Sequence, residues 1–159
     1  MEQNVNAVFL LTQLGTHAAG RFAERVAALG VTPPQVGLLR WLAQSPGNSQ
    51  QAMARHFNIQ PSRVVTFVDE LEQQGLAERR PDPADRRVRI VELTERGKEV
   101  MRGVRKVMQD HEEELLAPLS AEERAQMSDL LHRLAVQAGL TPGVHPGYPN
   151  LPPRIAKTT

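Results

Sequence analysis

A charged segment over residues 76–97 interrupts a chain that is otherwise patterned for helices. Its sequence, LAERRPDPADRRVRIVELTERG, contains two short β-prone runs joined by a turn rich in proline and aspartate. From Arg79 to Arg89 there are five arginines and two aspartates, a local net charge of +3 in a protein whose total is +1. A guanidinium on a protruding hairpin can enter the minor groove of DNA. The alternative interpretation is a solvated turn.

Apolar residues at steps of three or four predict helices before this hairpin. One such pattern covers residues 5–29. Thr32 and Gln35 form a capping box that opens a second helix, which ends near residues 45–47.

Two shorter helices are predicted next, separated by a tight turn. Ser49 can cap the first of them, and Asn58 breaks it. Pro61 suits the first turn of the second, which ends at Gly75. Two helices joined by a turn and followed by a hairpin predict a helix-turn-helix with a two-stranded wing, in a mainly α fold.

The chain after the hairpin predicts two further helices and a tail. Thr94 caps a helix that runs to about Leu116 and would be about 35 Å long, so its far half requires a partner. Ser120 opens the last helix with a second capping box. Residues 141–159 contain five prolines, and we expect an extended or disordered tail that could lie across a neighbouring subunit.

Composition narrows the classes of function. The chain has no cysteine, which excludes disulfides and thiolate metal sites. It has no apolar run of membrane-spanning length and no secretory leader, so we expect a soluble cytoplasmic protein that does not bind membranes. Few aromatic residues disfavour stacking on single strands. The chain shows no catalytic motif and no cofactor motif, so the sequence does not support an enzymatic function.

The chain resembles the MarR family of bacterial transcriptional regulators, named for multiple antibiotic resistance. The resemblance is strongest over residues 32–97 and is carried by Gly75-Leu76, Asp82-Pro83-Ala84-Asp85-Arg86-Arg87 and Leu93-Thr94-Glu95-Arg96-Gly97. It implies a homodimer that binds a pseudo-palindromic double-stranded operator, with half-sites about 10 base pairs apart.

The resemblance also implies a division of the chain. Residues 1–31 and 98–140 would form the dimerisation helices, and residues 32–97 the winged helix-turn-helix domain. The proline-rich tail over 141–159 would follow.

The resemblance makes the helix over 61–75 the recognition helix. Its early positions, from Pro61 on, face the major groove, and the candidates to read bases are Ser62, Arg63 and Thr66. Arg63 is the strongest of them because arginine can donate twice to guanine. The chain departs from the commonest family pattern at Val65 and Thr66, so its operator cannot be borrowed from a relative.

Phosphate and minor-groove contacts are assigned to other positions. Ser49 and Gln50 suit phosphate, at the start of the third helix. In the wing, the resemblance places Arg87 in the minor groove and makes Asp85 the residue that braces the loop by pairing with an arginine. Arg86 is expected to meet phosphate. A simple turn is the alternative role for Asp85.

The family resemblance implies a small aromatic or phenolic effector that releases DNA. Candidate lining residues are His17, Arg21, Arg40 and Trp41, although a packed or solvent-facing role suits each of them as well.

Two alternatives keep the same fold. One is a zinc-responsive regulator that uses His17, His111, Glu112, Glu113, Glu114 and His132, although a glutamate run is usually a solvated face. The other is a winged-helix protein-interaction module, which would leave the arginine-rich wing without a role.

Overall fold

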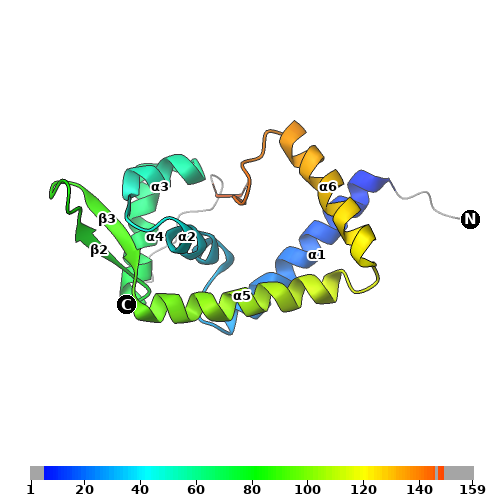
Figure 1. Cartoon of the computed structure of the whole chain (residues 1–159), viewed down its shortest axis with the longest axis horizontal. Helices are drawn as coiled ribbons and strands as arrows, with labels where there is room; N and C mark the ends of the chain where they lie inside the picture. Colours follow the sequence, from blue (N-terminus) through cyan, green and yellow to red (C-terminus); the bar gives the residue numbers. More distant parts are fainter. Residues whose placement is uncertain (1–5, 146, 149–159) are drawn as a thin grey trace, which may run out of the picture.

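The computed structural model describes residues 6–145, 147 and 148, which form six helices and three strands. Figure 1 shows the β2–β3 hairpin at one end of the molecule, with the start of α1 and all of α6 at the other end. The elements, in chain order, are α1 (Ala7–Ala27), α2 (Pro33–Gln44), β1 (Asn48–Ser49), α3 (Gln50–Phe57), α4 (Pro61–Gln73), β2 (Ala77–Pro81), β3 (Arg89–Leu93), α5 (Glu95–Leu115) and α6 (Ala121–Gln137). The predicted mainly α winged-helix fold is confirmed.

The helices begin and end where capping chemistry places them. Thr32 and Gln35 form the expected capping box at α2, and Ser120 and Glu123 form the one at α6. Asn58 ends α3 in the left-handed conformation, with φ of 50°.

The sheet is larger than predicted. It is antiparallel with the order β1-β3-β2, so the expected two-stranded wing carries a third strand. In β1, Asn48 pairs with Val91 and Ser49 pairs with Ile90. The sequence gives no sign of β1 because two residues cannot show an alternating pattern and their partners lie more than forty positions away.

We call α2, α3, α4 and the sheet the reading head, and in the described part of the chain a buried cluster of apolar side chains holds these elements together. Its members come from every helix except α6, from the sheet and from the segment after α6. They include Val26, Leu38, Leu39, Leu42, Met53, Phe57, Val64, Val68, Leu71, Val91, Met101, Val104 and Tyr148. Burying these side chains fixes α4 and the hairpin on one rigid body.

The turn after α4 is fastened to the start of α5. Thr94 donates through its hydroxyl to the carbonyl of Gly75 at 2.5 Å, and its own backbone amide donates to Leu76. A Cβ on Gly97 would come within 2.0 Å of the Leu76 carbonyl oxygen. The Leu-Thr-x-x-Gly sequence therefore sets how the hairpin leaves the helical body.

Two helices expose apolar side chains at the end of the molecule remote from the hairpin (Figure 1). Within the described chain, no residue of α6 is buried. The exposed residues are Val8, Phe9, Leu10, Leu11 and Leu14 on α1, and Leu130, Leu131, Leu134 and Val136 on α6, with Leu140 just beyond. Apolar surface of this extent indicates an interface.

The described part of the tail leaves Thr141, Pro142, Gly143 and His145 exposed but buries its last residue. Residues 141–145, 147 and 148 return to α2, where Tyr148 is only 3% exposed. One aromatic ring thus anchors the described end of this proline-rich segment. Residues 146 and 149–159 lie outside the described residues.

None of the helices in the described ranges is both long and apolar enough to cross a membrane.

Candidate nucleic-acid interface

Helix α4 presents a polar face to solvent beside the hairpin. Its inner face buries Val64, Val68 and Leu71 in the core. The opposite face, at helical spacing, consists of the exposed residues Ser62, Val65, Thr66 and Asp69. A helix held this firmly from one side can enter the major groove with the other.

The first turn of α4 suits an anion. Pro61 occupies the first helical position, and Gln60 makes no side-chain cap. The helix dipole and the uncapped turn favour a phosphate there. Arg63 is half-buried at the flank of this face and has an interaction within the chain.

Sequence reasoning passed over Val65 as a contact residue. Its side chain is 41% exposed on the outward face, between Ser62 and Asp69. An exposed methyl-bearing side chain on such a face is suited to the methyl group of thymine. The departure from the family pattern at this position was the available signal.

The two residues predicted for phosphate at α3 have internal roles. The Ser49 hydroxyl caps α3 by accepting from the Ala52 amide at 3.1 Å. The Gln50 side-chain oxygen accepts from Arg79 Nε at 2.6 Å. The structure therefore uses both side-chain oxygens to position the head.

Arg79 joins the wing to both helices of the head. In addition to its bond with Gln50, it pairs with Glu72 and with Asp69, the latter at 2.7 Å. It also donates to the Val65 carbonyl at 3.2 Å. Only 20% of its side chain is exposed. In the sequence, Arg79 counts among the basic residues of the hairpin. In the structure its charge is neutralised by Asp69 and Glu72, and it links the hairpin to α3 and α4.

Arg80 is also compensated, because it pairs with Glu78 and approaches Glu92 at 3.8 Å. The positive charge of the hairpin therefore remains at its tip. There Arg86, Arg87 and Arg89 are exposed and have no side-chain partner among the described residues. These three unpaired guanidiniums, two on the turn and one at the start of β3, are available to a polyanion.

The aspartates of the tip shape the turn. Asp82 accepts from the Ala84 amide at 2.8 Å, and Asp85 accepts from the Arg87 amide at 3.0 Å. Asp85 makes no ion pair within the described chain, so the arginine pairing expected for it is replaced by a turn-forming role. The turn bond fixes the backbone from which Arg87 projects.

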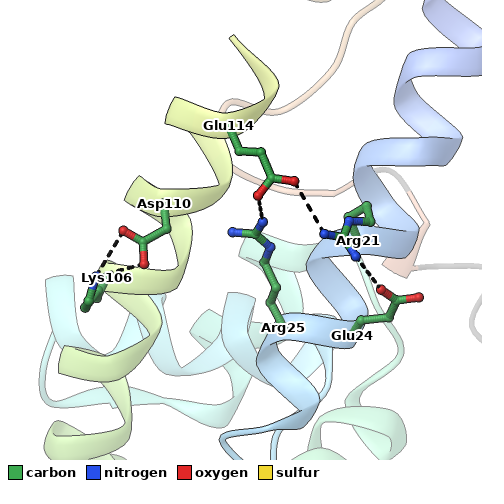
Figure 2. A network of polar contacts seen from close by, with 6 residues as sticks. All are labelled: Arg21, Glu24, Arg25, Lys106, Asp110 and Glu114. Atoms are coloured by element: carbon green, nitrogen blue, oxygen red, sulfur yellow. Dashed lines mark hydrogen bonds and ion pairs between the residues drawn. The ribbon is translucent and has the colours of Figure 1, made fainter. Parts of the chain in front are cut away.

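Arg21, a candidate for the effector site, is held in an ion-pair network between α1 and α5. Figure 2 shows Glu114 of α5 between Arg21 and Arg25, with Glu24 also contacting Arg21. Hydrogen bonds to Glu114 and then Glu24 raise the pKa of Arg21. Hydrogen bonds from Arg25 and then Arg21 lower the pKa of Glu114. Glu24 and Glu114 therefore already compensate the charge of Arg21 within the chain.

The other effector candidates lie apart. Arg40 and Trp41 line a cavity of about 310 Å³ beside the tail, with His56 and Phe57. Trp41 stacks on His56 with ring centroids 5.3 Å apart. His17 is exposed on α1, and neither it nor Arg21 lines this cavity. The four candidates therefore do not form one site.

The residues of the zinc alternative do not converge. His111 packs against Phe22, with ring centroids 5.8 Å apart. Across the described ranges, no group of three or more His, Asp or Glu side chains is placed to hold a metal ion.

Comparison with known proteins gives a consistent set of relatives. A family model described as the MarR family matches residues 31–88. A Thauera aromatica protein named as a transcriptional regulatory protein for the hcr operon is 34% identical over 123 residues, covering 77% of this chain and 74% of the relative. The transcriptional repressor Rv2887 of Mycobacterium tuberculosis is 29% identical, over 79% of this chain and 91% of its own.

Solved structures match over most of their length. The complex of Rv2887 with DNA superimposes with a TM-score of 0.69 and 27% identity, covering 82% of this chain and 98% of that one. The PcaV regulator of Streptomyces coelicolor, solved with its natural ligand, gives a TM-score of 0.68 and 27% identity, covering 87% and 97%.

Proposed function

Because the chain belongs to the MarR family of transcriptional regulators, we propose that it grips operator DNA as a homodimer, with α4 in the major groove and Arg87 in the adjacent minor groove. It is a DNA-binding regulator of the winged-helix class and not an enzyme. The observation that carries the proposal is the placement of charge. The free arginines of the tip lie on the same rigid head as the exposed polar face of α4.

Contact roles follow from this placement. Ser62, Val65 and Thr66 would meet base edges, with Arg63 reaching in from the flank. Arg86 would contact phosphate while Arg87 enters the narrow groove. Asp85 contributes indirectly, because it fixes the turn that carries Arg87.

The homodimer is supported by apolar surface that this chain leaves uncovered. Residues 1–31 and 98–140 would supply the dimerisation helices, and the described parts of both ranges carry exposed leucines. Two heads related by a two-fold axis would read a pseudo-palindromic operator with half-sites about 10 base pairs apart.

Repression is the proposed direction of regulation. A relative with high coverage is named a repressor, and its structure was solved on DNA. A protein that occupies two successive turns of a promoter would block polymerase access.

Release by a small aromatic or phenolic effector is the proposed signal, supported by the ligand-bound PcaV structure. A panel of aromatic acids should include a compound that weakens operator binding and changes Trp41 fluorescence. A broad panel that leaves both readouts unchanged would contradict this part of the proposal.

DNA binding is tested with fragments of the source genome. The purified protein should select specific duplex fragments, and the affinity should fall steeply as salt rises. Arg87→Ala should weaken the selected site about 5- to 150-fold at fixed salt. Arg63→Ala should relax the choice among sequences. Arg102→Ala, an exposed arginine on α5, is the matched control and should leave affinity unchanged.

A further inference from the structure

The segment after α6 has a place in the fold that DNA binding does not use. It leaves the far end of the molecule and returns toward α2 (Figure 1). Tyr148, the one tyrosine in the sequence, lies in the core cluster of the reading head. A proline-rich segment that buries its aromatic residue in its own domain is a bound element rather than a free tail.

The cleft that holds Tyr148 matches a phenol. The ring packs against Phe57 of α3 and Phe67 of α4, with centroids 4.8 Å and 6.5 Å apart. The hydroxyl donates to the carbonyl of Pro34 at 2.6 Å. Burial raises the pKa of Tyr148, so the hydroxyl stays protonated and remains a donor. The cleft thus has aromatic walls and one acceptor at its end.

Gly37 of α2 makes room for the hydroxyl. A Cβ at this position would stand 1.9 Å from the Tyr148 hydroxyl oxygen. Glycine inside a helix is less favourable than alanine, so α2 accepts a local cost at the point where the phenol docks. The absence of a side chain at Gly37 therefore leaves the space that the Tyr148 hydroxyl occupies.

A second contact and two cavities complete the site. Arg40 donates to the carbonyl of Gly143 at 2.6 Å, which ties the segment to α2. Cavities of about 310 and 350 Å³ lie beside the segment, each lined partly by its residues. The tail therefore forms part of the wall of each cavity.

We propose that the cleft between α2 and the α3–α4 pair is a phenol-binding site that the chain's own Tyr148 occupies, so that a free phenol enters only by displacing the tail. Because Phe57 and Phe67 form the walls, a change of occupant is transmitted to the helices of the reading head. Any effect on DNA rests on the proposed function, but occupancy of the cleft does not.

Occupancy is measured by NMR on the full chain with labelled tyrosine, which gives the signals of a single ring. The ring protons of Tyr148 should show contacts to Phe57 and Phe67. Adding p-cresol, which reproduces the tyrosine side chain, should move the ring signals to the positions of free tyrosine. Toluene lacks the hydroxyl that meets Pro34, so it should require a higher concentration.

Two variants separate the tail from the cleft. Tyr148→Ala empties the cleft. If the tail is undocked in a tenth or less of the wild-type molecules, p-cresol should bind the variant at least about tenfold more tightly than the wild type. Gly37→Ala fills the space for the hydroxyl, so the Tyr148 signals should be those of free tyrosine and p-cresol should not bind. Gly20→Ala on α1, where a Cβ meets nothing within 4 Å, is the matched control.

Free-tyrosine signals in the wild type would overturn the inference, as would equal p-cresol affinity with and without Tyr148. Signals of a docked ring in Gly37→Ala would do the same, and this variant serves even if Tyr148→Ala does not fold. These measurements contain no DNA. Docking without operator binding would refute only the proposed function, and operator binding without docking would refute only this inference.

Discussion

Arg79 and Arg87 lie on one hairpin, and the structure assigns them opposite roles. Replacing Arg79 with methionine keeps the packing of its aliphatic stem but removes the bonds to Gln50, Glu72 and Asp69. A hydrogen bond to a charged group contributes about 1.5–3 kcal/mol when shielded from water. An exposed ion pair contributes about 0–1 kcal/mol.

The solvent exposure of the two acidic partners places the contribution of each ion pair between the shielded and the exposed values. The side chains of Glu72 and Asp69 are 34% and 51% exposed, so the Glu72 pair contributes most and the Asp69 pair little. Freed rotamers of the lost arginine offset part of this contribution. We expect Arg79→Met to lower the free energy of unfolding by about 2 kcal/mol, a fall in Tm of about 4–8 °C.

Arg87→Met is the matched variant. The side chain is exposed and unpaired within the described residues, so stability should change by less than about 0.5 kcal/mol. Operator affinity should instead fall by about 1–3 kcal/mol. Urea denaturation at one protein concentration measures the first quantity, and fluorescence anisotropy on labelled operator measures the second. An unchanged unfolding free energy in Arg79→Met, or an equal loss in Arg87→Met, would refute the division of roles.

Three further changes test other parts of the structure. Gly97→Ala should destabilise by more than about 2 kcal/mol in urea denaturation, because its Cβ would meet the Leu76 carbonyl at 2.0 Å; a neutral result would remove the fastening between the turn and α5. The pKa of Glu114 is lowered by its ion pairs, so these pairs stabilise the fold above the ordinary pKa of 4.5, and the stabilisation is lost as pH falls below that value. Glu114→Gln should therefore make the free energy of unfolding fall less steeply at acid pH. An unchanged pH profile would contradict this. Leu134→Glu should shift the protein from dimer to monomer in light scattering after gel filtration; a persistent dimer would exclude α6 from the interface.

Local chemistry made much of the fold predictable. Caps at Thr32 and Ser120 act through neighbours three residues away, and helical periodicity needs only a few turns, so both are visible in a single segment. The hairpin was predictable for the same reason. Strand β1 was not, because its only signal is a pairing with β3.

The candidate site likewise has features that a single segment reveals and features that only the fold reveals. The exposed arginines of the tip could be identified as a group, but which ones are free depends on Asp69, Glu72 and Glu92, which the fold brings to Arg79 and Arg80. The docking of the tail was still harder to predict from the sequence. It requires Tyr148 and Gly37 to meet across more than a hundred residues, and neither is unusual in its own segment.

The central claim is that two copies of this head read two adjacent turns of duplex. A hydroxyl-radical footprint of the highest-affinity genomic fragment tests it most directly. The account predicts two protected half-sites about 10 base pairs apart, flanked by minor-groove protection that disappears in Arg87→Ala. A single protected half-site, or minor-groove protection that survives in Arg87→Ala, would contradict it.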